Sequence, residues 1–152
     1  MPSRSPSARR RAREFVLQGL YQQQLSGNPA SAIRAQVSEA AGFARADEAY
    51  FDELWKGVTA NYDDLVALVE PHLDRRAAQL SPIERAILVI GAWELKERLE
   101  IPCRVVINEA IELAKSYGGT DGHRFVNGVL DKLAASLRAS EMESVRTGRG
   151  TA

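Results

Sequence analysis

The sequence predicts an all-α protein of about seven helices. Apolar residues recur three to four positions apart along most of the chain, and the alternation of apolar and polar residues that marks a β-strand is nearly absent. Helix start and stop signals divide this pattern into separate segments. The predicted helices span, in order, about residues 7–25, 30–41, 46–60, 61–73, 81–95, 102–117 and 121–137.

The first two predicted helices are bounded by turn and stop signals. Ser7 is a suitable N-terminal cap for the first, which ends before the turn-prone sequence SGNP at 26–29. The second carries Ile33 and Val37 one turn apart, and Gly42 closes it.

The third predicted helix has an apolar stripe, and the fourth has a start signal and a break. Asn61 and Asp64 resemble a cap and a first-turn acid that open the fourth helix. Pro71 kinks or ends it, because proline has no backbone N–H to donate. The stripe of the third helix consists of Tyr50 or Phe51, Leu54, Trp55 and Val58.

The clearest start signal is SPIE at 81–84. Ser81 can accept a hydrogen bond from the backbone, Pro82 suits the first helical position, and Glu84 can reach back to complete a capping box. The sequence AILVIGAW at 86–93 is apolar over eight consecutive residues. A helix that is hydrophobic all round and too short to cross a bilayer is surrounded by other helices, so we expect it at the centre of the bundle.

The last two predicted helices each carry a clean apolar stripe. Pro102 opens the first of them, and Gly118-Gly119 ends it. Thr120 or Asp121 caps the second. The stripes consist of Val106, Ala110, Leu113, Ala114 and Tyr117 in one helix, and of Val126, Val129, Leu130, Leu133 and Leu137 in the other.

The length of 152 residues suits one domain with a buried core. We expect residues 1–7 to be a flexible extension, residues 8–138 to fold, and residues 139–152, which are polar and aperiodic, to be a disordered tail. Cys103 is the single cysteine, so a disulfide framework and a cysteine-based zinc site are excluded. No segment has the roughly 20 apolar residues of a membrane span, and we expect a cytoplasmic protein.

Positive charge is concentrated at the N-terminus, although the chain has no formal net charge. Residues 1–13 contain five arginines and no acid, so the other 139 residues carry a formal charge of −5. The apolar stretch that follows stops at Gln18, which excludes a secretory signal. A mitochondrial presequence remains an alternative for the Arg- and Ser-rich leader.

The histidines and the cysteine show no catalytic arrangement. His72 and His123 are far apart and form no metal-ligand motif, so surface or core positions are favoured for both. Cys103 lies at a predicted helix start, which can stabilise a thiolate, but no partner base flanks it and packing is favoured.

The remaining candidates for chemistry have simpler explanations. Glu109 and Glu112 are three residues apart on one helix, but Glu112 is better explained by an ion pair with Lys115. Gly118-Gly119 lacks the rest of a phosphate-loop motif. We therefore expect no catalytic residues, no cofactor and no metal.

The clustered arginines favour a polyanionic partner, because like charges held close together repel one another and a polyanion offsets that cost. About four phosphate contacts with single-stranded nucleic acid would give a log–log salt slope of about −3. Such contacts supply affinity without sequence preference, which needs base contacts elsewhere on the protein. The cluster consists of Arg9, Arg10, Arg11 and Arg13.

The start of the last predicted helix is a candidate for those base contacts. Phe125 lies to one side of the apolar stripe, and Asp121 is one turn before it on the same flank. An exposed ring can stack on a base while a carboxylate accepts a hydrogen bond from the base edge. The alternative is that Phe125 packs against a neighbouring helix and Asp121 only caps its own.

Three segments together resemble the NusB family of bacterial transcription antitermination factors. They are ARRRAREFVLQGLYQ at 8–22, SPIERAILVIGAWEL at 81–95 and VINEAIELAKSYGGTDGHRFVNGVLDKL at 106–133. The resemblance covers roughly residues 8–138 and is weakest at 26–46. It implies two perpendicular three-helix bundles with an additional helix.

The resemblance also implies a role without catalysis. Proteins of this family bind the boxA RNA element of ribosomal RNA leaders together with NusE, a ribosomal small-subunit protein. The pair helps RNA polymerase, in a complex with NusA and NusG, to read through terminators. Alternatives are a self-associating helical scaffold, since some relatives form homodimers, and an RNA-anchoring domain of the kind found on ribosomal RNA methyltransferases.

By matching position, the resemblance assigns roles to individual residues. The arginine cluster falls on the RNA-binding N-terminus of the family, and Asp121 and Phe125 fall on RNA contacts. Tyr21 and Glu84 fall on the NusE interface. Tyr21 is alternatively a buried residue one turn after Leu17, and Glu84 is alternatively only the last member of the capping box. The leader before residue 8 and the tail after Arg138 receive no role.

Overall fold

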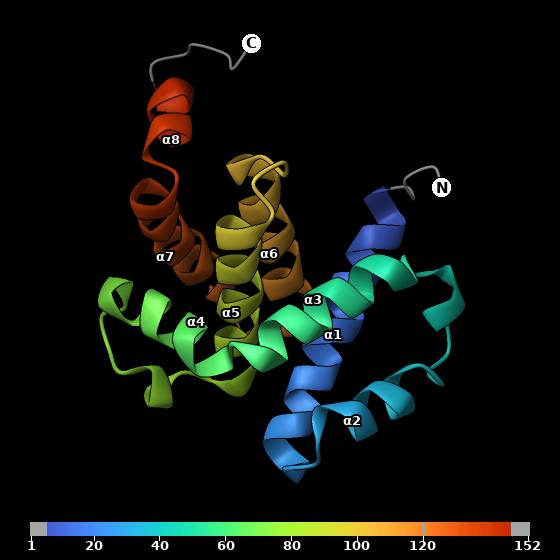
Figure 1. Cartoon of the computed structure of the whole chain (residues 1–152). Coiled ribbons are helices and arrows are strands. Elements are labelled where there is room, and N and C mark those ends of the chain that lie inside the picture. The colour runs from blue at the N-terminus through green and yellow to red at the C-terminus, as the bar shows by residue number, and fades with distance from the viewer. Residues whose placement is uncertain (1–5, 120, 147–152) are drawn as a thin grey trace. The chain divides into compact units, whose positions relative to one another are not determined.

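The computed structural model describes residues 6–119 and 121–146, and this part of the chain contains only helices and their connections (Figure 1). The predicted all-α class is confirmed, and all seven predicted helices are present. The α-helices are α1 (Pro6–Ser26), α2 (Ala30–Val37), α3 (Glu48–Ala60), α4 (Tyr62–Val69), α5 (Pro82–Glu97), α6 (Cys103–Tyr117), α7 (Gly122–Leu137) and α8 (Ala139–Arg146). The 3₁₀ helices are η1 (Phe43–Arg45), η2 (Glu70–His72) and η3 (Ala77–Gln79).

The chain divides into two compact units, residues 1–62 and 63–152. In the first unit, α1 contacts α2, η1 and α3. Aromatic side chains hold these helices together: the ring of Phe43 meets Phe15 and Phe51 edge-on, with centroids 5.3 and 5.2 Å apart, and Phe51 stacks on Trp55 at 6.2 Å. All four rings are buried, so this cluster forms the centre of the first core.

An ion-pair network at the surface of the first unit connects α2 to α3. The Arg34 guanidinium lies 2.8 Å from the Glu48 carboxylate and 3.0 Å from that of Asp52. The hydrogen bonds that Arg34 donates to Asp52 and Glu48 raise its pKa above the usual value. The pairs are partly exposed, so they fix the position of α2 more than they add to stability.

Gly19 lies where α1 packs closely against Trp55 of α3. A Cβ atom at this position would lie 2.8 Å from Cζ3 of the buried Trp55 ring. We expect Gly19→Ala to lower the free energy of unfolding, because overpacking costs about 1–3 kcal/mol and exceeds the ~1 kcal/mol that alanine gains in a helix. Gly128→Ala on α7 is the matched control, since a Cβ there would meet nothing within 4 Å. In urea denaturation, the free energy of unfolding should fall for Gly19→Ala and rise for Gly128→Ala. A rise for both variants would contradict this packing.

The second unit is built on α5, α6 and α7, which contact one another pairwise. Residues 86–95 of α5 are buried without interruption. The prediction that this apolar segment lies at the centre of a helix bundle is therefore confirmed. The apolar stripes of α6 and α7 supply most of the remaining core, although Tyr117 at the end of the α6 stripe is exposed.

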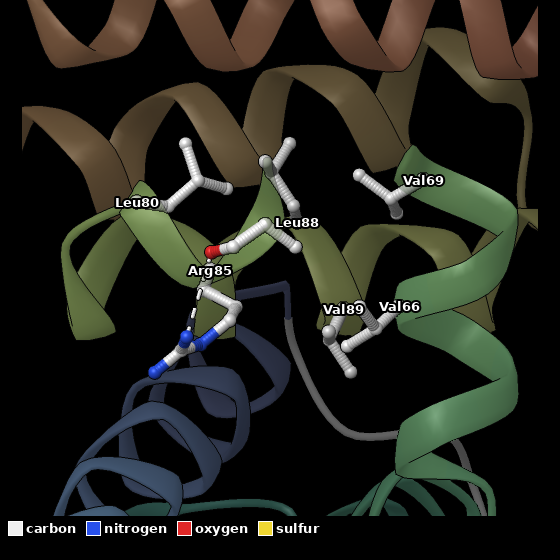
Figure 2. Close-up of a pocket in the computed structure, with 7 residues that line it drawn as sticks. Val66, Val69, Leu80, Arg85, Leu88 and Val89 are labelled. Atoms are coloured by element: carbon white, nitrogen blue, oxygen red, sulfur yellow. Dashed lines mark hydrogen bonds between the residues drawn. The ribbon is translucent and has the colours of Figure 1, made fainter. Parts of the chain in front are cut away.

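Helix α4 packs on α5 and η3 and leaves a cavity of only about 10 Å³ (Figure 2). Val66 and Val69 of α4 face Leu88 and Val89 of α5 across it. At its edge, Nη1 of Arg85 donates to the carbonyl oxygen of Ala77 at 3.4 Å. This volume is about that of one water molecule, far below what a small-molecule site needs.

Several helix ends differ from the predictions. Helix α2 ends at Val37, and the chain turns through Gly42, with φ of +88°, into η1. Asn61 stands between α3 and α4, and its Nδ2 donates to the carbonyl of Gly57 at 2.8 Å, which satisfies the end of α3. The predicted break at Pro71 is confirmed, because α4 gives way there to η2.

Residues 139–146, predicted to belong to a disordered tail, form α8. Glu141 of α8 accepts hydrogen bonds from the backbone N–H of Cys103 at 2.6 Å and from Nη1 of Arg138 at 3.1 Å. The buried Arg138 guanidinium also donates to backbone carbonyls at the end of α5 and in the loop after it. Those carbonyls belong to Glu94, Leu95, Arg98 and Ile101. The predicted extension falls mostly on residues 1–5, outside the described residues, as do tail residues 147–152.

Candidate nucleic-acid interface

The predicted arginine cluster forms the first turns of α1 and separates into two pairs. Arg9 and Arg13, one turn apart, both face Tyr50 of α3, with guanidinium carbons 4.3 and 5.5 Å from the ring centroid. Arg13 is only 3% exposed, so its guanidinium serves packing against the ring. Arg10 is exposed and Arg11 is half-buried. The charge accessible to a partner therefore lies on Arg9, Arg10 and Arg11.

The electrostatics of this helix start favour an anionic partner. Exposed N–H groups give the first turn of a helix partial positive charge, so cations there are unfavourable and anions favourable. The first turn of α1 contains no acid. Asp47 supplies partial compensation, with its Oδ2 3.8 Å from Nε of Arg9.

The same segment is anchored by the backbone. The N–H of Asp47 donates to the carbonyl of Ala8 at 3.0 Å, and the Asp47 carboxylate accepts from the N–H of Tyr50 at 3.1 Å to cap α3. The arginines are thus displayed on a helix whose beginning is fixed to α3.

Asp121 stands immediately before α7 but does not cap it, contrary to the prediction. Its backbone is left-handed, with φ of +63°, and its side chain makes no capping hydrogen bond. A capping residue has extended backbone, which aims the carboxylate at the helix N–H groups, and the left-handed conformation does not. The exposed carboxylate lies 3.9 Å from Nε of Arg124. Thr120, the alternative cap, lies outside the described residues.

Phe125 is half-buried and does not belong to the buried core. The guanidinium carbon of Arg75, from the segment between η2 and η3, lies 5.0 Å from the centroid of its ring. Arg75 is in turn held by Asp74 through Nε–Oδ1 and Nη2–Oδ2 contacts of 2.7 and 3.2 Å. The ring is therefore at the surface of the second unit, four residues after Asp121 and covered on one side by an arginine.

Glu84 lies at the same end of α7. Its backbone N–H donates to Oγ of Ser81 at 3.1 Å, which confirms the serine half of the predicted capping box. Its side chain extends toward α7, because a Cβ atom on Gly122 would lie 3.2 Å from Oε2 of Glu84. This places a carboxylate at a helix N-terminus, where the dipole favours it. The structure thus brings Glu84, Asp121 and Phe125 to one end of α7.

Tyr21 is 37% exposed on α1, so the alternative of a buried tyrosine is wrong. Leu25, one turn further along the same helix, is 68% exposed. Two apolar side chains one turn apart thus form a short exposed stripe on α1.

The contacts of Cys103, Glu112 and Lys115 are those of structural residues. Burial raises the pKa of the Cys103 thiol to about 11, so it is protonated near neutral pH and is a poor nucleophile. Glu112 and Lys115 form the expected pair, with Oε1 and Nζ 4.0 Å apart. Among the described residues, no three histidine, cysteine or acidic side chains gather as a metal site would require. None of the described helices is long and apolar enough to cross a membrane.

Sequence reasoning missed Arg75 and Arg138. Arg75 lies in LDRRAAQL, a connection between helices, so no helical periodicity relates it to Phe125 some fifty residues later. Arg138 stands next to a polar tail and has the surroundings of a solvent-exposed residue. For Arg75, the only signal in the sequence is the pair of adjacent arginines at 75 and 76. No signal in the sequence identifies Arg138.

Comparisons with known proteins agree on one family. Residues 10–135 match the NusB family. The transcription antitermination protein NusB of Aromatoleum aromaticum is 57% identical over 143 residues, covering 94% of this chain and 99% of the relative. That of Paraburkholderia xenovorans is 54% identical over 140 residues, covering 92% and 97%.

Solved structures show the same likeness. The structure of T. maritima NusB is 27% identical and superposes with a TM-score of 0.79, covering 93% of this chain and 99% of that one. A crystal structure of the antitermination factors NusB and NusE in complex with double-stranded RNA is 25% identical, with a TM-score of 0.73, covering 87% and 99%.

Proposed function

The chain belongs to the NusB family, and on that basis we propose that it is a transcription antitermination factor that binds boxA RNA together with NusE. It acts as an adaptor: it holds an RNA element and a protein partner and has no catalytic step of its own. The observation that carries the proposal is the presence in one chain of two features: an arginine-rich helix start on α1, and an aromatic ring and a carboxylate at the start of α7.

The two regions have different roles in this proposal. Arg9, Arg10 and Arg11 contact phosphates, which adds affinity for any single strand. Phe125 stacks on a base, and Asp121 accepts a hydrogen bond from a base edge, which adds sequence preference. Arg13 has a supporting role, because its place over Tyr50 keeps the start of α1 packed on α3.

Protein partners use other residues in this proposal. Exposed Tyr21, with Leu25 beside it, and Glu84 contact NusE. The acidic remainder of the chain suits a basic ribosomal protein. We propose further that the complex joins RNA polymerase, NusA and NusG in the cytoplasm, and that the chain can also form a homodimer.

The test is a titration of boxA RNA and a scrambled RNA of equal length, with and without NusE, at two salt concentrations. We expect tight binding only with NusE, a preference for boxA, and weaker binding at higher salt. Equal affinity for the two RNAs in the presence of NusE would mean that the protein binds RNA only through its positive charge, without sequence preference, and would refute the proposal. A stable dimer that binds neither RNA nor NusE would instead support the self-associating scaffold.

A further inference from the structure

We propose that Arg75 is part of the base-binding surface: its guanidinium and the Phe125 ring form one stacked platform on which an RNA base lies. This inference rests on the proposed function and adds to it a residue that no sequence pattern related to the site. The platform consists of Arg75 from the η2–η3 segment, Phe125 from α7, and Asp74, which orients the guanidinium.

The guanidinium of Arg75 lies over the ring of Phe125. The Arg75 guanidinium carbon lies 5.0 Å from the Phe125 centroid, within the range of cation–π contact. The guanidinium therefore covers one side of the ring. Arg75 retains 47% of its side-chain exposure, so the outward face is accessible. Guanidinium planes and aromatic rings are the two surfaces on which proteins stack unpaired RNA bases.

The guanidinium plane is held in place before any ligand binds. Asp74 engages both Nε and Nη2, at 2.7 and 3.2 Å, in the two-point geometry that fixes the plane of an arginine. These hydrogen bonds lower the pKa of Asp74 and raise that of Arg75, so both groups are charged at neutral pH. A side chain fixed in this way loses little conformational freedom on binding.

The local charge favours a base over a phosphate. Two cations, Arg75 and Arg124, share the region with three carboxylates, those of Asp74, Glu84 and Asp121. Lys132, whose charge acts on Asp74, brings the formal sum to zero, so the region offers a phosphate group no net attraction. Carboxylates accept hydrogen bonds from the exocyclic amino groups of adenine, guanine or cytosine, and those are the bases that this surface suits.

The test compares Arg75→Ala and Arg75→Lys in the full chain with NusE, using boxA and scrambled RNA. Alanine removes both the positive charge and the planar guanidinium, whereas lysine keeps the charge and removes only the planar group. We expect boxA affinity to fall about tenfold for alanine and at least about threefold for lysine, with scrambled RNA less affected. Arg124→Ala is the control, because it removes a neighbouring positive charge that makes no contact with the ring. It should weaken the binding of boxA and of scrambled RNA by the same factor.

A spectroscopic readout reports on the ring itself. The chain has four phenylalanines, so 4-fluorophenylalanine gives four ¹⁹F signals, and Phe125→Leu identifies that of Phe125. We expect this signal to shift on boxA binding in the wild type and to shift less in Arg75→Lys.

The outcomes separate this inference from the proposed function. If Arg75→Lys matches the wild type while the wild type prefers boxA, the platform is refuted and the function stands. Tighter binding by Arg75→Ala also refutes it, because Arg75 would then cover the ring. If the wild type shows no preference for boxA, the proposed function itself has failed.

Discussion

Arg138→Ala is expected to lower the free energy of unfolding by about 3–5 kcal/mol, the range observed when a buried charged hydrogen-bonding group is removed. Arg138 is 6% exposed and donates to four backbone carbonyls where α5 ends and the following loop begins. The carbonyls of Glu94 and Arg98 also accept backbone N–H groups, from Arg98 and Ile101. The alanine variant therefore removes one partner from these two carbonyls and leaves those of Leu95 and Ile101 without the guanidinium that they bind. Urea denaturation followed by circular dichroism measures the change.

Two control variants test whether the loss of stability comes from the hydrogen bonds that the guanidinium donates. Arg138→Lys keeps the charge but offers a compact ammonium in place of the five-donor fork, so it should recover only part of the loss. Arg124→Ala, with 79% of its side chain exposed, should change stability by no more than about 0.5 kcal/mol. Equal effects of the alanine variants at 138 and 124 would contradict the role of Arg138.

Phe125→Leu is expected to reduce the preference for boxA over scrambled RNA by about tenfold or more, since stacking on an aromatic ring contributes roughly 1–3 kcal/mol per base. Leucine keeps apolar bulk and removes the flat face. Because Phe125 is only half-buried, the fold should survive the change. Fluorescence anisotropy with both RNAs in the presence of NusE gives the ratio of Kd values.

The matched variant is Phe125→Trp, which keeps and enlarges the ring. It should retain the preference for boxA, whereas Phe125→Leu should not. The stacking role is refuted if both variants bind as the wild type does, or if Phe125→Leu loses RNA binding only in proportion to a loss of folded protein.

The helices could be predicted from the sequence because their signals are local. The serine cap and first-turn proline of α5, the apolar segment 86–93 and the stripes of α6 and α7 all depend on residues a few positions apart. Helix α8 could not be predicted in this way. Its residues have little apolar periodicity, and it is linked to the rest through Glu141, whose partners are Cys103 and Arg138.

The candidate site was predicted in part. Helical spacing and the family resemblance identified the arginines, Asp121 and Phe125, but spacing alone did not show that Arg13 lies against Tyr50 or that Asp121 has left-handed backbone. Arg75 reaches Phe125 only through the tertiary fold. Contacts between residues about fifty positions apart leave no periodic trace in one sequence.

The central claim is that affinity for RNA and sequence preference have separate sources. The start of α1 supplies the affinity, and the start of α7 supplies the sequence preference. The most direct test is the salt dependence of Kd for boxA and scrambled RNA, measured with NusE for the wild type, for Arg10→Ala/Arg11→Ala and for Phe125→Leu. The double variant should reduce the steepness of the log–log salt slope by about 1.4, or ~0.7 per lost phosphate contact, and keep the preference for boxA. Phe125→Leu should keep the slope and lose the preference. A result in which both variants change slope and preference alike would contradict the claim.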